Sequence, residues 1–177
     1  MKGVVFSELI NWVEADFSPR LADDMILNSG VPGDGAYTTG GYYPHEDALA
    51  LLTALSGLTG QPTNELARSY GRFLSGRLAE HHPQFMANQT DVHSFLRNVE
   101  PHIHSEVRKL YPEVRTPSVD ASEDEDGLHV TYASHRPFAD VAHGLIEGFI
   151  AYFGEDLLVE RLSTSPDGTR AEFRVGR

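Results

Sequence analysis

The chain has 177 residues and no cysteine, which excludes disulfides, thiolate metal ligands and cysteine-type zinc sites. Its formal net charge of −12 at pH 7 argues against a general binding surface for nucleic acid or anionic membranes, and its longest apolar runs are too short to span a bilayer. The length favours one domain, residues 1–177, and the N-terminus lacks the apolar segment and cleavage site of a signal peptide.

The first half of the chain is predicted to be helical. Ser18 is a typical N-cap before Pro19, and Gly30 is a typical stop for the helix between them. A stretch rich in Gly, Tyr and Thr over 31–43 predicts a loop. From the spacing of the apolar residues and these signals, helices are expected over 4–13, 19–29, 46–58 and 63–80.

A further helical segment leads to His104. Thr90-Asp91 is the expected cap at its start. Pro101 lies inside the segment, and it should kink or break the helix because proline lacks an N–H and clashes with the preceding turn.

The second half has the pattern of strands around one helix. Leu128, Val130 and Tyr132 alternate after an Asp-Gly turn signal, and Ser-Pro-Asp-Gly at 165–168 predicts a hairpin turn. A broad apolar helix face lies between these signals, made of Phe138, Val141, Ala142, Leu145, Ile146, Phe149, Ile150 and Phe153. The element order predicts an α+β fold, with a helical N-terminal part packed on a C-terminal antiparallel sheet with a helix.

Two segments about thirty residues apart carry the functional chemistry. The first, 99–112, presents imidazoles on a helix that ends in a basic turn. In the second, Tyr132, Ser134 and Arg136 occupy alternate positions, so a strand would point all three side chains the same way. Together these segments suit a haem, because a neutral imidazole binds iron and a guanidinium with hydroxyls binds propionates.

Most of the nine histidines are expected to be ordinary surface or core residues. His102 and His104 are two residues apart, so on a regular helix they face different ways and cannot jointly chelate one metal. One of the two can face a haem, and the apolar neighbours Ile103 and Val107 favour His104.

The chain resembles the haem-nitric oxide/oxygen binding family, which includes the haem domain of soluble guanylate cyclase. The resemblance extends over nearly the whole chain, from the opening Met1-Lys2-Gly3 through the His104 helix and the Tyr-x-Ser-x-Arg motif to Gly-Leu-Ile-Glu-Gly at 144–148. It implies that a haem b (iron protoporphyrin IX) is bound, with His104, seven residues before Tyr111, as the iron ligand. Tyr132, Ser134 and Arg136 would hold the propionates, and Pro117 would distort the haem.

The resemblance also identifies the distal side of the haem, where the gas binds. Oxygen-binding members carry hydrogen-bond donors there, a tyrosine above all. The matching positions here are Val141, Leu9 and Leu74, with Val5 and Leu145 nearby, and all are aliphatic. The alternative interpretation of these residues is ordinary core packing. Aliphatic side chains are expected in both cases, in a packed core and in a dry pocket.

The function implied is that of a bacterial, cytoplasmic gas sensor rather than an enzyme. Nitric oxide and carbon monoxide would be its ligands, and a histidine kinase or a cyclic-di-GMP enzyme would be its separate partner. The chain contains no P-loop, kinase motif or cyclase pattern, which favours an input module.

Three alternatives are weighed against this function. An oxygen sensor or carrier would use the same haem, but the distal side lacks a donor. A metal-dependent hydrolase would use His81, His82 and His102 with nearby carboxylates, although their spacing is not that of a known site. A haem-free interaction domain is disfavoured because His104 and Arg136 are retained.

Overall fold

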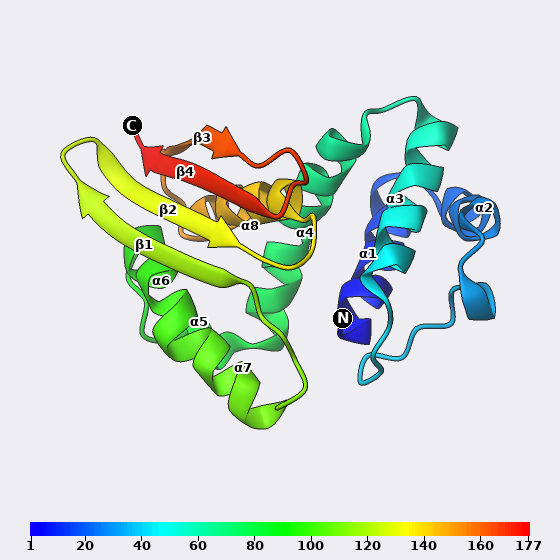
Figure 1. The fold of residues 1–177 in the computed structure, drawn as a ribbon, viewed down its shortest axis with the longest axis horizontal. Helices are drawn as coiled ribbons and strands as arrows, with labels where there is room; N and C mark the ends of the chain where they lie inside the picture. Colours follow the sequence, from blue (N-terminus) through cyan, green and yellow to red (C-terminus); the bar gives the residue numbers. More distant parts are fainter. The chain divides into compact units, whose positions relative to one another are not determined.

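Helices form the first half of the chain and a sheet with further helices forms the second, as predicted for this α+β fold (Figure 1). The computed structural model describes residues 1–177. The chain divides into two compact units, Met1–Tyr70 and Gly71–Arg177, and the division falls inside helix α4. None of the helices combines the length and apolarity needed to cross a membrane.

The N-terminal unit is helical throughout. Its elements are α1 (Gly3–Asp16), α2 (Pro19–Ser29), the short 3-10 helix η1 (Pro32–Gly35), α3 (His45–Thr59) and the start of α4 (Thr63–His81). The Ser18 hydroxyl accepts a hydrogen bond from the Leu21 N–H at 3.1 Å, and Gly30 ends α2 with a φ of 68°, so both predicted signals act as expected. The core of this unit contains Phe6, Trp12, Val13, Met25, Leu51 and Leu55.

The C-terminal unit is built on an antiparallel sheet with strand order β1-β2-β4-β3. The strands are β1 (Ser118–Asp124), β2 (Gly127–Ala133), β3 (Leu158–Thr164) and β4 (Arg170–Gly176). One face of the central strands is buried through the pairs Leu128↔Val175, Val130↔Phe173 and Tyr132↔Ala171. Both predicted turns are present, and Gly168 has the positive φ, 68°, that its turn requires.

Helices cover the buried face of this sheet (Figure 1). After the remainder of α4, they are α5 (Pro83–Met86), α6 (Val92–Asn98), the π-helical segment η2 (Val99–His104), α7 (Ser105–Leu110) and α8 (Ala139–Tyr152). Helix α8 lies against β3 and β4, whereas α6 and η2 lie against β1. Phe95 of α6 and Phe149 of α8 meet with ring centroids 4.2 Å apart, so the two helix groups share one core.

The C-terminal part of α4 packs closely on α8 through glycines. A Cβ added at Gly71 would lie 2.3 Å from the Val141 carbonyl oxygen, and one added at Gly148 would lie 1.9 Å from the Ser75 hydroxyl. Arg72 and Glu147 form a salt bridge at 2.9 Å beside this contact. The absence of side chains at the two glycines is therefore what allows the helices to approach each other.

At Pro101 the helix contains a π turn, a form of disturbance that the sequence alone did not predict. The capped start is confirmed, because the Asp91 carboxylate accepts from the Ser94 N–H at 2.7 Å. At Pro101 the helix does not break; it widens into the π turn of η2 and continues as α7. A π turn accommodates one extra residue, so the helix continues past Pro101 although proline has no backbone N–H to donate.

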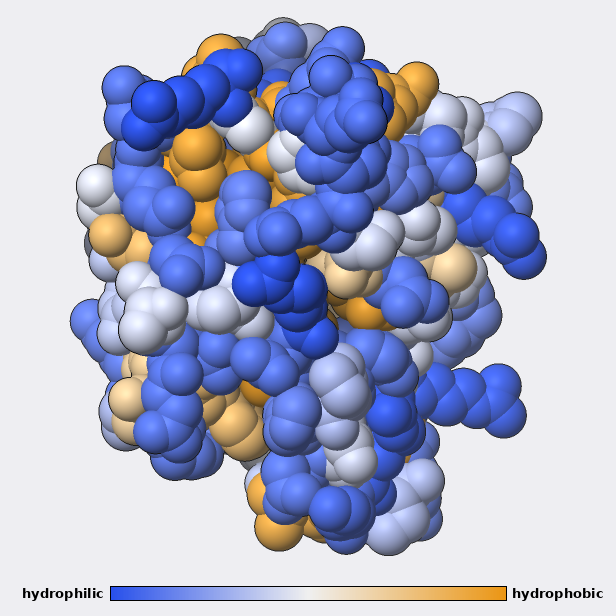
Figure 2. Space-filling model, turned by 90° about the vertical axis from the view of Figure 1, so that its left-hand side faces the viewer, coloured by the Kyte–Doolittle hydropathy of each residue, from blue (hydrophilic) through white to orange (hydrophobic).

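The molecular face in Figure 2 is mainly hydrophilic, and its hydrophobic atoms lie between polar side chains. This distribution agrees with the acidic composition of the chain.

Candidate functional site

His104 ends the π turn and is the best-placed imidazole for a ligand. Its side chain is only 15% exposed, and its Nδ1 lies 2.9 Å from Glu100 Oε2, four residues earlier. A carboxylate oxygen can only accept, so Nδ1 carries the hydrogen when the imidazole is neutral. The other ring nitrogen, Nε2, then has a free lone pair, which is the form that binds a metal.

The surroundings of His104 favour this neutral form. Burial lowers the pKa of His104, and the neighbouring guanidinium of Arg108 acts in the same direction. The hydrogen bond to Glu100 and the backbone of Pro117 oppose the effect, but the pKa remains below its usual value. His104 is therefore a neutral donor toward Glu100 at pH 7.

Glu100 is the centre of a small hydrogen-bond network. Its Oε1 accepts from Arg108 Nη1 at 2.9 Å, and its Oε2 also accepts from the backbone N–H of Val119 at 3.4 Å. Burial raises the pKa of Glu100, but its hydrogen bonds with His104 and Arg108 outweigh that effect and lower the pKa overall. Arg108 also donates to Thr116 Oγ1 at 2.7 Å, which ties α7 to the segment before β1.

The Tyr-x-Ser-x-Arg motif is not carried by one strand, and the prediction that a strand aligns all three side chains is wrong. Strand β2 ends at Ala133, so only Tyr132 lies on it. The Ser134 hydroxyl accepts from the Arg136 N–H at 3.1 Å and forms a local turn before Pro137. The Ser134 N–H still donates to the Thr169 carbonyl oxygen at 2.9 Å, so the chain leaves the sheet after Ser134.

The three side chains of the motif nevertheless gather around one place. Burial raises the pKa of Tyr132, while its hydrogen bond with Ser134 and the charge of Arg136 lower it; burial has the larger effect. The phenol therefore stays protonated at pH 7 and can donate. Arg136 Nη1 donates to the Arg115 carbonyl oxygen at 3.3 Å. A phenol, a hydroxyl and a guanidinium are a suitable donor set for carboxylates.

The segment 115–117 is in contact with both halves of this site. Arg136 donates to the Arg115 carbonyl, Arg108 donates to the Thr116 hydroxyl, and the backbone carbonyl of Pro117 raises the pKa of His104. A neutral imidazole and a group of carboxylate-binding donors are thus held by the same three residues. These residues fit a haem, which needs an axial nitrogen and partners for two propionates.

The predicted distal residues are distributed over both units. Val5 and Leu9 lie on α1 in the N-terminal unit, where the Val5 carbonyl accepts from the Tyr70 phenol at 2.5 Å. Leu74 on α4 and Val141 on α8 are buried in the C-terminal unit, and Leu145 packs against its core. None of the five side chains can donate a hydrogen bond.

Glu100 has contacts that the sequence did not predict, whereas His143 is as expected. Glu100 was recognisable only as an acid four residues before His104, a spacing that places two side chains on one face of a helix. His143 was expected to be an ordinary surface or core residue, and it is a core residue, with Nδ1 3.0 Å from Arg161 Nη2.

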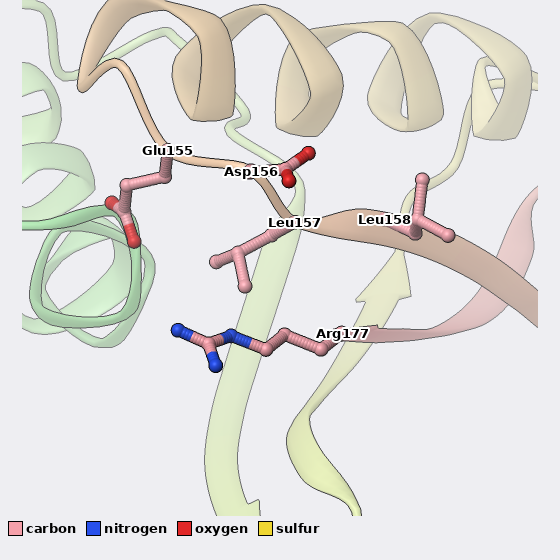
Figure 3. A pocket seen from close by; sticks show the side chains of 5 residues that line it. All are labelled: Glu155, Asp156, Leu157, Leu158 and Arg177. Carbon is pink, nitrogen blue, oxygen red and sulfur yellow. The ribbon is translucent and has the colours of Figure 1, made fainter.

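The metal-hydrolase alternative finds no support in the arrangement of side chains. No group of three His, Asp or Glu side chains is placed to hold a metal ion. A cavity of about 620 Å³ lies at the ends of β3 and β4, lined by Glu155, Asp156, Leu157, Leu158 and Arg177 (Figure 3). Glu155 caps α6 there, since its Oε1 accepts from the Val92 N–H at 2.6 Å. The cavity contains none of the predicted site residues.

Comparisons with known proteins identify the family of the chain. Residues 2–161 match the model of the Haem-NO-binding family, so the chain belongs to this family of haem-binding sensor domains. No curated protein sequence is significantly similar to the chain.

The chain is also similar to solved structures of H-NOX proteins. The unliganded Fe(II) H-NOX protein from K. algicida is 29% identical, with a TM-score of 0.90 over 99% of this chain and 96% of that chain. The S. oneidensis H-NOX protein in the Fe(II)NO ligation state is 21% identical, with a TM-score of 0.90 over 99% and 98% of the two chains. A mutant of T. tengcongensis H-NOX is 24% identical, with a TM-score of 0.88 over 99% and 97%. At these low sequence identities, the similarity to the last two structures establishes the fold alone.

Proposed function

We propose that this protein is a nitric oxide sensor that carries haem b and signals to a separate partner. The observation that carries the proposal is the buried His104 ring, neutral and held through Nδ1 by Glu100, in a chain of the Haem-NO-binding family. Ferrous haem supplies an iron with one coordination position for the protein and one for the gas.

Each residue of the site has a separate task in this proposal. His104 gives the iron its nitrogen ligand through Nε2. Tyr132, Ser134 and Arg136 donate hydrogen bonds to the propionates, whose burial would otherwise be costly. Pro117 follows Arg115, whose carbonyl Arg136 contacts, and it would lie against the macrocycle of a bound haem and distort it.

The choice of gas follows from the distal residues. Bound dioxygen gains partial negative charge and is stabilised by a hydrogen-bond donor, whereas nitric oxide and carbon monoxide bind ferrous iron without one. Leu9, Leu74 and Val141 have aliphatic side chains. None of them offers a donor, so the protein would favour nitric oxide and carbon monoxide over oxygen.

The whole chain, residues 1–177, is proposed to act as one haem-binding domain, since the family match extends over both compact units. His104 would hold the iron of a bound haem, and a gas that weakened this hold would free the helix of η2 and α7 to move with the segment 115–117. A ligand can shift only an equilibrium whose two states it contacts differently, and loss of one axial bond is such a difference. The partner is proposed to be a bacterial, cytoplasmic histidine kinase or cyclic-di-GMP enzyme.

An absorption spectrum of the reduced protein tests the proposal. The purified protein is expected to be red, and the spectrum should change on addition of nitric oxide under anaerobic conditions. A colourless protein that does not take up added haem would contradict haem binding. A haem protein whose reduced spectrum is unaffected by nitric oxide would contradict the sensor function.

A further inference from the structure

We propose that Glu100 is a positioning residue that sets the strength of the bond between His104 and the iron, and with it the ease with which nitric oxide breaks that bond. This inference deepens the proposed function and rests on it. Nothing in the family resemblance points to Glu100, but its contacts with the His104 ring do.

The first step is the geometry of the pair. Glu100 and His104 lie four residues apart within the π turn, and the 2.9 Å separation of Oε2 and Nδ1 is that of a charge-assisted hydrogen bond. Both side chains are mostly removed from water, with exposed fractions of 29% and 15%. The hydrogen bond is therefore poorly screened and fixes both the tautomer and the rotation of the ring.

The second step is the way in which Glu100 is itself held. Oε1 accepts from Arg108 Nη1, and Oε2 accepts from the Val119 N–H in addition to His104. These partners come from α7 and from the start of β1. The carboxylate therefore cannot rotate away without losing two other hydrogen bonds. The network places an anionic acceptor permanently on Nδ1.

The third step is the chemical consequence for the ligand. An imidazole that donates Nδ1–H to a carboxylate gains electron density on Nε2 and becomes a more basic ligand. A more basic Nε2 binds the iron more strongly and resists displacement when nitric oxide binds on the opposite side. Arg108 weakens this effect, because its guanidinium partly neutralises the negative charge of the Glu100 carboxylate.

The iron–histidine stretching band of the reduced protein, measured by resonance Raman spectroscopy, tests this role. Glu100→Gln keeps the size of the side chain and removes its charge, so the band should move to lower wavenumber. At a fixed nitric oxide concentration, the ratio of protein with a broken iron–His104 bond to protein with an intact one should rise by about tenfold, the scale of such outer-shell effects on metal sites.

Two further variants separate an electronic role from a purely structural one. Arg108→Met leaves Glu100 with a less neutralised charge, so the band should move to higher wavenumber, opposite to Glu100→Gln. Glu106→Gln is the matched control, because Glu106 is exposed on α7 and pairs only with Lys109. Its band should coincide with that of the parent.

The outcomes distinguish this inference from the proposed function. If the parent shows an iron–histidine band that Glu100→Gln leaves unchanged, the haem site stands and the role of Glu100 is refuted. Shifts of Glu100→Gln and Arg108→Met in the same direction would also refute it, because loosening of the helix would then explain both. If the parent shows no such band, or if the band survives in His104→Gly, the assignment of His104 itself is wrong.

Discussion

Arg136 donates a hydrogen bond from its guanidinium to the backbone carbonyl of Arg115, at 3.3 Å. Arg115 stands two residues before Pro117, whose backbone carbonyl raises the pKa of His104. The proposed propionate donors and the proposed iron ligand thus both lie beside the segment 115–117.

Loss of Arg136 should weaken haem binding while the fold persists. Removing one partner of a buried ion pair costs about 3–5 kcal/mol, so Arg136→Ala is expected to lose haem far more readily than the parent. Haem transfer to an excess of apomyoglobin measures this loss. Arg115→Ala is the control, because it removes an exposed side chain and keeps the carbonyl that Arg136 contacts. Equal haem loss from Arg136→Ala and the parent would refute the clamp.

Replacement of His104 by glycine should remove the protein ligand of the iron. The space left by the ring admits free imidazole, so added imidazole is expected to restore a parent-like reduced spectrum. His102→Ala, two residues earlier on an exposed position of the π turn, should have the spectrum of the parent. The opposite result, a normal spectrum in His104→Gly and a changed one in His102→Ala, would move the ligand to His102.

The reduced protein should form no stable oxygen complex in air. Absorption spectra after exposure of the ferrous protein are expected to show unchanged ferrous haem or slow oxidation to the ferric form, because Leu9, Leu74 and Val141 donate no hydrogen bond. Val141→Tyr introduces a phenol and should increase oxygen binding, whereas Val141→Phe adds the ring without the donor. A stable oxygen complex of the parent would contradict the assignment of these residues.

The close contact of α4 and α8 should make Gly148 sensitive to the smallest substitution. A Cβ at this position would lie 1.9 Å from the Ser75 hydroxyl, so Gly148→Ala should lower the free energy of unfolding by about 1–3 kcal/mol. Gly76→Ala on α4 is the matched control, because its Cβ has no neighbour within 4 Å. There the substitution should raise stability by about 0.5–1 kcal/mol, since alanine loses less backbone entropy. Urea unfolding measures both, and equal effects would refute the packing argument.

The cap of the helix that leads to His104 should give stability a defined pH dependence. A hydrogen bond from the backbone N–H of Ser94, and one from the side-chain hydroxyl of Thr90, lower the pKa of Asp91 below its ordinary value of 3.8. The stabilisation by this carboxylate is therefore complete above that value and is lost as the pH falls through the lower pKa of the folded state. Asp91→Ala should cost about 1 kcal/mol at pH 7.

Asp91→Asn is the control for the charge, because asparagine caps a helix without titrating. The stability difference between the parent and Asp91→Asn should shrink as the pH falls below 3.8, the ordinary pKa. A difference that is constant across this range would show that the charge of Asp91 contributes nothing.

Much of the fold was predictable because its signals are local. The caps at Ser18 and Asp91 and the turns at Gly127 and Gly168 each depend on neighbouring residues, and all are present. Alternation along 128–132 likewise identified the buried face of β2. Such patterns need no knowledge of distant parts of the chain.

The sequence predicted less well where one local pattern is compatible with two different backbone structures. Ser134 alternates correctly with Tyr132, but its hydroxyl binds the Arg136 N–H, and this bond ends the strand before Pro137. Pro101 was predicted to kink or break its helix, and the structure has a π segment there that continues into α7. The role of Glu100 depends on Val119, nineteen residues away, which no spacing rule reaches.

The π turn at Val99–His104 is equivalent to a single-residue insertion within an α-helix. Each residue of an α-helix advances the chain by about 100° around the axis, so the turn fixes which side of the helix His104 occupies. The wider turn takes up the inserted residue, so α7 continues the helix while Glu100 and His104 stay within hydrogen-bond distance. The six residues of this segment therefore set how far along the helix the imidazole lies from the Asp91 cap.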